Sequence, residues 1–195
     1  DHSSVKETQA MLASYSLLIE NKQKETQREY ERAERLLANI LPQNTIKQLK
    51  TFGKTTPEHY SDVSVLFLDF VGFTVLSQQM ELEQLFEELN EIFTTFDNIC
   101  EKFSCERIKT IGDAYLAVCG MHTQTKEHAS SITSAAIEMR EYLLKRNKYS
   151  QHQWICRIGI HSGPLMGGVV GKLKYIYDIF GDGVNTAARM ETSSE

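Results

Sequence analysis

The stretch VSVLFLDFVGFT, residues 63–74, decides how this chain folds. Its first eight residues are mostly apolar, a pattern that predicts a strand buried in the middle of a sheet. Near its end this strand carries Asp69, and a carboxylate in such a place is costly unless it is paired with a positive group or binds a cation. The stretch therefore predicts a core strand with an acid near its end that must be paired or bind a cation.

The pattern downstream of this strand predicts an α+β domain. Apolar residues spaced by three and four over residues 82–103 and 129–143 predict two amphipathic helices with wide core faces. Residues 106–120, ERIKTIGDAYLAVCG, predict a hairpin around a Gly-Asp turn. QWICRIGIHSG and PLMGGVVG predict two further strands, and a last helix begins at Val184. This order favours a ferredoxin-like split βαβ sheet with helices packed on it.

Residues 1–50 predict a helical segment ahead of this domain. Residues 20–35 hold five acidic and five basic side chains and no Gly or Pro. A short a/d seam follows the spacing of Tyr30, Ala33, Leu37 and Ile40. Two interpretations stay open, because one heptad does not decide between them. The segment is either a solvated helix flanking the domain or a parallel coiled coil that carries a signal into it.

Composition limits the class of protein. The 195 residues are 41% hydrophobic and 24% charged, which suits one globular domain with a helical extension. The net charge of −5 argues against a nucleic-acid partner. No apolar run approaches the roughly 20 residues of a membrane helix, and the four cysteines form no C-x-x-C pair, so we expect a cytoplasmic location. Since the chain starts without methionine, we expect it to be a piece of a longer protein.

Asp69 and Asp113 are the candidate metal ligands. In a split βαβ sheet the first strand lies beside the hairpin, so the strand end and the hairpin turn can meet. Two carboxylates there would hold two Mg²⁺ ions, an arrangement that suits in-line attack on phosphorus. Spacing alone equally allows Asp113 to be an ordinary turn residue and Asp69 a helix cap. The FGKTT at residues 52–56 lacks the first glycine of a phosphate-binding loop and is interpreted as a surface turn.

Four motifs, in this order and spacing, resemble the catalytic domain of class III adenylyl and guanylyl cyclases. They are FLDFVGFT, RIKTIGDAYLAV, RIGIHSG and YDIFGDGVNTAARME. Upstream, ERAERLLANILP resembles the helical transducer that joins sensor domains to many of these cyclases. The resemblance implies a transducer over residues 1–50 and a catalytic domain over residues 57–195. That domain is C-terminally incomplete, because family members normally continue with further strands and a lysine that contacts the triphosphate.

The resemblance also implies roles for individual residues. The implied metal ligands are Asp69, Asp113 and the carbonyl of Phe70. The implied triphosphate contacts are the amides of Gly72, Phe73 and Thr74, together with Arg157. The implied purine-reading pair is Lys109 and Asp178. The pair that would orient the ribose and stabilise charge on the α-phosphate is Asn185 and Arg189, four residues apart on one helix face.

Together these roles imply an adenylyl cyclase that converts ATP into 3′,5′-cyclic AMP and pyrophosphate with two Mg²⁺ or Mn²⁺ ions. Its sites would form in a head-to-tail homodimer, regulated through the N-terminal helix by an upstream sensor domain. Lys109 and Asp178 could satisfy either purine by hydrogen bonding. The family pattern favours adenine, because guanylyl cyclases typically have Glu and Cys at these positions. A guanylyl cyclase and a catalytically silent dimeric signalling module remain the alternatives.

Overall fold

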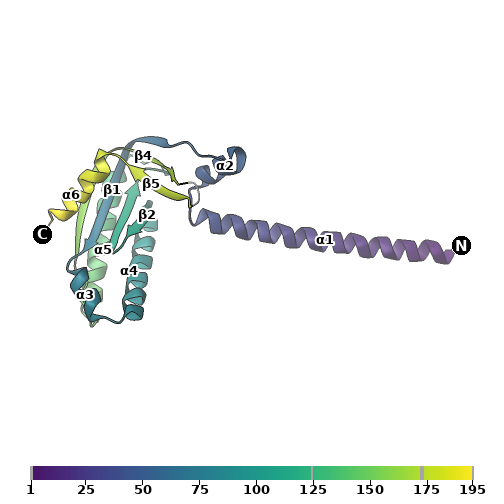
Figure 1. Cartoon of the computed structure of the whole chain (residues 1–195), viewed down its shortest axis with the longest axis horizontal. Helices are drawn as coiled ribbons and strands as arrows, with labels where there is room; N and C mark the ends of the chain where they lie inside the picture. The colour runs from purple at the N-terminus through teal and green to yellow at the C-terminus, as the bar shows by residue number, and fades with distance from the viewer. Residues whose placement is uncertain (1, 124, 172–173, 195) are drawn as a thin grey trace. The chain divides into compact units, whose positions relative to one another are not determined.

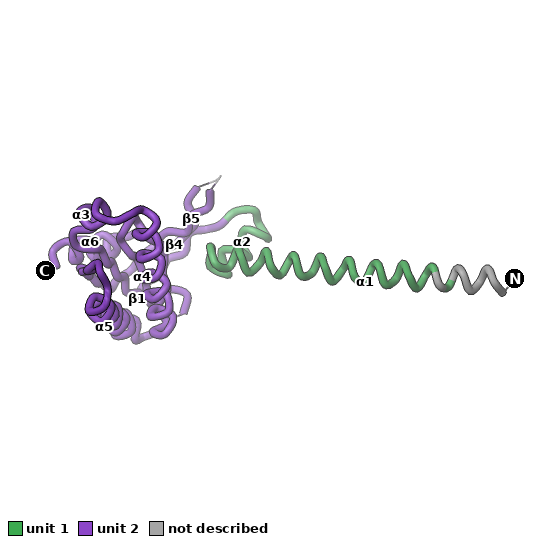
Figure 2. Tube along the Cα trace, turned by 90° about the horizontal axis from the view of Figure 1, so that it is seen from below, with its two compact units in different colours: residues 1–54 green, residues 55–195 purple. Residues whose placement is uncertain are grey.

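The computed structural model describes residues 2–123, 125–171 and 174–194, and the chain forms two compact units, residues 1–54 and 55–195 (Figure 2). The first unit consists of α1 (His2–Ala38) and α2 (Gln43–Phe52). Pro42 precedes α2, and Gly53 ends it in the left-handed conformation at φ 65°. Tyr30 and Ile40 of the predicted seam are exposed. No described helix is long and apolar enough to cross a membrane.

The second unit is a five-stranded antiparallel sheet with helices on both faces (Figure 1). Its elements are β1 (Glu58–Phe70), α3 (Phe73–Gln79), α4 (Leu82–Lys102), β2 (Cys105–Ile111), β3 (Ala114–Cys119), α5 (His128–Arg146), β4 (Cys156–Val170), β5 (Ile176–Phe180) and α6 (Asp182–Thr192). The strand order is β2-β3-β1-β4-β5. The first four strands with α4 and α5 make the predicted split βαβ fold, and β5 extends it at the β4 edge.

The central strand β1 divides its side chains between two cores. Leu66 and Leu68 join the core under α4 and α5, whereas Val63 and Val65 join the smaller core that includes Ala187 of α6. Because strand side chains alternate, Asp69 follows Val63 and Val65 onto the α6 side of the sheet. The candidate metal ligand is therefore on the opposite face from the large core.

One predicted strand break is wrong. QWICRIGIHSG and PLMGGVVG were expected as separate strands, but β4 runs through Pro164 without interruption. The register between β1 and β4 shifts from Tyr60–Leu165 to Val63–Gly163, so two β1 residues face one β4 residue. Pro164 lies at this bulge, where the missing N–H interrupts no regular ladder.

The predicted core stripe of α4 is wrong at its start. Ile92 and Phe96 are fully buried, as their spacing predicts, but Leu82 and Phe86 are 80% and 73% exposed. Both lie in the first two turns of α4, where Leu85 packs against the core but Leu82 and Phe86 do not. Amphipathic spacing predicted the helix correctly but not how much of it the sheet covers.

Candidate active site

The hairpin turn brings Asp113 beside Asp69. Leu68 of β1 pairs with Tyr115 of β3, so the next residue of β1 lies level with the turn between β2 and β3. Gly112 occupies that turn at φ 65°, a conformation that glycine adopts without strain. Burial raises the pKa of Asp113 above its ordinary value, and the neighbouring Asp69 carboxylate raises it further. The structure thus crowds two carboxylates at one end of β1.

This pair fits a divalent cation. Carboxylate and carbonyl oxygens are the ligands that Mg²⁺ and Mn²⁺ prefer, and the Phe70 carbonyl follows Asp69 directly. Over the part of the chain that the structure describes, no three His, Cys, Asp or Glu side chains gather into a metal cluster. An ion held by Asp69 and Asp113 would therefore complete its coordination with carbonyl, water or phosphate oxygens.

Arg157 lies between Asp69, a candidate metal ligand, and a second acid, Glu191. It pairs directly across from Asp69 in the sheet, and its Nη2 is 3.3 Å from Asp69 Oδ2. Its Nε is 3.0 Å from Glu191 Oε1 on α6. Glu191 is only 7% exposed, and it was not among the site residues predicted from the sequence. The helical spacing in the sequence could have indicated its burial, because Glu191 follows Ala187 by four residues and so shares the buried face of α6.

The purine-reading residues implied by the resemblance meet in the structure. Lys109 of β2 donates from Nζ to Asp178 Oδ2 of β5 over 2.6 Å. Their side chains are 31% and 17% exposed, so the pair is accessible to a ligand. Asp178 Oδ1 also accepts from the Ile179 amide over 2.9 Å, which fixes the carboxylate plane. The pair presents one donor and one acceptor group side by side.

Asn185 and Arg189 lie on the exposed side of α6. Within the described residues no hydrogen bond or ion pair joins either side chain to Asp69, Asp113 or the Lys109–Asp178 pair. One chain therefore does not bring all of the implied residues together.

The implied triphosphate seat lies where β1 leads into α3. Gly72 precedes this helix at φ 71°, and its carbonyl accepts from the amides of Val75 and Leu76. The amides of Gly72, Phe73 and Thr74 come before the first intrahelical donors, which is where helices present free N–H groups.

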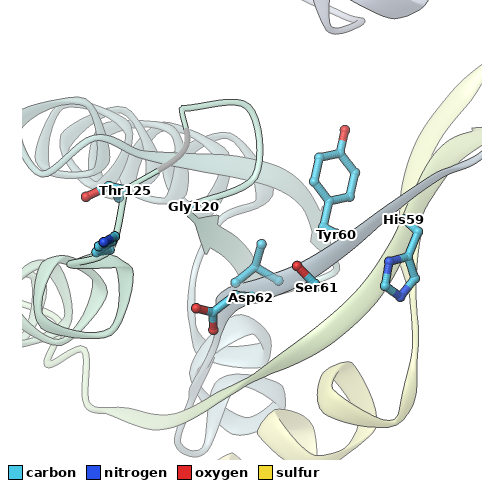
Figure 3. A pocket seen from close by; sticks show the side chains of 8 residues that line it. His59, Tyr60, Ser61, Asp62, Gly120 and Thr125 are labelled. Atoms are coloured by element: carbon cyan, nitrogen blue, oxygen red, sulfur yellow. The ribbon is translucent and has the colours of Figure 1, made fainter.

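A polar pocket of about 400 Å³ lies at the other end of β1 (Figure 3). His59, Tyr60 and Asp62 line it, and none of the implied site residues does. Asp62 Oδ1 is 3.2 Å from His128 Nε2, and His128 Nδ1 is 2.7 Å from the buried Ser64 Oγ. These contacts satisfy buried polar groups between β1 and α5, consistent with a structural role for this histidine.

Residues 55–195 match the family model described as the adenylate and guanylate cyclase catalytic domain. A receptor-type guanylate cyclase of Caenorhabditis elegans is 38% identical over 91% of the chain, and the chain spans 18% of that protein. The catalytic core of a rhodopsin-guanylyl cyclase with converted specificity, solved with ATPαS, is 34% identical with a TM-score of 0.67, covering 72% of this chain and 77% of that one.

The adenylyl cyclase CyaB of P. aeruginosa is 28% identical with a TM-score of 0.66, over 72% of this chain and 76% of that one. The curated relatives at 34–38% identity include guanylate cyclases. The chain belongs to the adenylate and guanylate cyclase catalytic domain family.

Proposed function

We propose that this chain is the catalytic part of an adenylyl cyclase, which forms 3′,5′-cyclic AMP and pyrophosphate from ATP. The observation that carries the choice of base is the contact between Lys109 and Asp178. Asp178 can accept from the adenine N6 amino group while Lys109 donates to N1. Guanylyl cyclases typically have Glu and Cys at these two positions, and this chain has neither.

The remaining residues supply binding and electrostatics. Asp69, Asp113 and the Phe70 carbonyl would hold Mg²⁺ or Mn²⁺, two ions to a site, which lower the pKa of the ribose 3′-hydroxyl and neutralise phosphate charge. Arg157 and the amides at the start of α3 would bind the phosphates. Asn185 would orient the ribose, and Arg189 would stabilise the charge that grows on the α-phosphate in the transition state.

A second copy of the chain would complete each site. Asn185 and Arg189 are exposed on α6 and make no contact with the carboxylate pair of their own chain, so a head-to-tail homodimer would place them over the partner's metal site. We expect a monomer to be nearly inactive. The chain spans less than a fifth of its curated relatives' length, so an upstream sensor acting through α1 is part of the proposal.

Guanylyl cyclase is the second candidate, and the names of the relatives favour it. Overall similarity does not fix the base, however. The rhodopsin-guanylyl cyclase core at 34% identity is one whose specificity was converted and which was solved with an ATP analogue. For this reason we give the two residues at the purine position more weight than the whole-domain identity.

The test is product analysis with each nucleotide. The chain is incubated with ATP or GTP and Mg²⁺ or Mn²⁺, beside an Asp113→Asn variant, and cyclic nucleotides are separated by chromatography. Cyclic AMP formed from ATP and lost in the variant supports the proposal. Cyclic GMP alone would replace it with the guanylyl alternative. No product, from this chain or from the longer protein with its C-terminal strands, would leave a silent signalling module.

A further inference from the structure

Helix α6 packs directly against the backbone of β4 at Gly159. A Cβ atom placed on Gly159 would lie 2.1 Å from the Ala187 carbonyl oxygen and 2.1 Å from the Glu191 amide nitrogen. Such distances leave no room for a side chain between strand and helix. The backbone of Glu191 is therefore held at a fixed height above β4, with Arg157 two residues from Gly159 on the same face of the strand.

The buried negative charge of Glu191 is balanced by the guanidinium of Arg157. Among the described residues neither Glu191 Oε1 nor Arg157 Nε has a hydrogen-bonding partner, so their 3.0 Å ion pair is what offsets the burial of both atoms. Glu191 Oε2 accepts a long 3.3 Å bond from the Thr192 hydroxyl. Within the described ranges, Arg157 is the one charged side chain that pairs with this buried carboxylate.

Arg157 is shared between two acids with different tasks. Its Nη2 end reaches Asp69 at 3.3 Å, while its Nε side faces Glu191. A divalent cation on Asp69 competes with the guanidinium for the same carboxylate. When the guanidinium withdraws from Asp69, it keeps a counter-ion only because Glu191 is there.

We propose that Glu191 is a positioning residue that holds Arg157 by Nε, so that Asp69 is free to take a metal ion and the Nη groups are free for phosphate. The inference rests on the proposed function, since it concerns the same metal site. Without the Glu191 charge, Asp69 becomes the only carboxylate on Arg157 and binds it more tightly. Metal affinity then falls, although neither Asp69 nor Asp113 has changed.

The test compares Glu191→Gln, which keeps the shape of the side chain, with Glu138→Gln, which removes a carboxylate paired with Lys102 on the surface of α5. Mn²⁺ binding is measured on the nucleotide-free chain by electron paramagnetic resonance, and half-saturating Mn²⁺ is measured in the cyclase assay. We expect Glu191→Gln to weaken Mn²⁺ binding about tenfold, the size of a typical coupling between contacting residues, with turnover at saturating Mn²⁺ much less affected. Glu138→Gln should match the wild type.

Making Glu191→Gln in a chain that already carries Arg157→Gln distinguishes a positioning role of Glu191 from a general loss of stability. In an Arg157→Gln chain Asp69 has no competing guanidinium, so adding Glu191→Gln should leave Mn²⁺ affinity unchanged. Equal Mn²⁺ affinity in wild type and Glu191→Gln, or an equal loss in both backgrounds, would overturn the inference and leave the cyclase function standing. A wild-type chain that neither binds Mn²⁺ nor cyclises a nucleotide would overturn the proposed function, and this inference with it.

Discussion

Lys109 and Asp178 lie on the two edge strands of the sheet, yet their side chains meet at 2.6 Å. Three strands separate β2 from β5, so the two edges of a flat sheet would be about 19 Å apart at the usual strand spacing. The contact therefore requires a strongly curled sheet. The two side chains meet on the α6 side of the sheet, because Lys109 pairs with Leu116, which belongs to the core that includes Ala187 of α6.

Replacing Lys109 and Asp178 should change which nucleotide the enzyme prefers. We expect Lys109→Glu with Asp178→Cys to weaken the use of ATP and to admit GTP, because the donor and acceptor groups of this pair are replaced. The ratio of kcat/KM for the two nucleotides measures the effect. The matched control is Lys102→Glu with Glu138→Cys, an exposed ion pair elsewhere in the domain. An unchanged ATP preference in the exchanged chain would contradict a base-reading role.

Removing one metal-site charge should abolish turnover without unfolding the domain. Asp113→Asn keeps the size of the side chain and relieves the crowding of two carboxylates, so we expect folding to be retained. Cyclic nucleotide formation should fall by at least about a hundredfold, which is the usual loss of kcat when one group that stabilises the transition state electrostatically is removed. Circular dichroism checks the fold, and Asp62→Asn at the other end of β1 is the control. Activity within a few-fold of wild type would exclude the two-metal assignment.

The contact between β4 and α6 should tolerate no side chain at position 159. Gly159→Ala places a methyl group against the backbone of Ala187 and Glu191, so the helix must shift or detach. We expect a loss of about 3 kcal/mol in the free energy of unfolding, at the upper end for overpacking, together with loss of activity. Gly163→Ala is the matched control on the same strand, because its methyl group would meet only the His161 ring at 3.5 Å. Denaturant titration measures both variants, and equal stability would contradict the packing argument.

The acid stability of the domain should depend on Glu88. Burial alone would raise the pKa of Glu88, but hydrogen bonds from Trp154, His152 and Arg146 outweigh it and hold the pKa below its ordinary value of 4.5. A lowered folded-state pKa contributes stability above the ordinary value, and that contribution is lost as pH falls through the folded-state value.

Glu88→Gln should therefore cost about 3 kcal/mol at neutral pH, because it leaves the largely buried Arg146 short of a counter-ion. The difference from wild type should shrink as pH falls below 4.5 and through the lowered folded-state pKa, because wild-type Glu88 is then protonated itself. Urea titrations at pH 7 and at a series of lower pH values measure this. A difference that does not change over the series would show that the Glu88 charge contributes nothing.

Two of the four thiols, Cys100 and Cys156, should react slowly in the native protein. Burial raises the pKa of each to about 11. At pH 8 only about one molecule in a thousand then carries a thiolate at either position, and the thiolate is the reactive form. We expect labelling of these two residues by a thiol reagent, located by peptide mapping, to be at least tenfold faster in urea than in buffer. Rapid native labelling of either residue would contradict its buried setting.

The sequence predicted the parts of this site that follow from local pattern. A strand ending on Asp69 and a Gly-Asp turn before Ala114 are sufficient to place two carboxylates together once the split βαβ order is recognised. Glu191 was missed because its partner, Arg157, is distant in the chain and only the packing of α6 brings them together. The strand break predicted at Pro164 was wrong for a related reason. The bulge that accommodates this proline is formed by the extra residue on β1, a different strand.

The curled sheet has one more consequence. Edge strands carry unpaired N–H and C=O groups and are the usual points at which β-proteins aggregate by adding a further strand. Here each edge strand carries a charged side chain, Lys109 on β2 and Asp178 on β5, which opposes the docking of a foreign strand. The residues that would select the nucleotide would thus also protect the protein from edge-to-edge aggregation, and replacing both with apolar residues would expose it to that hazard.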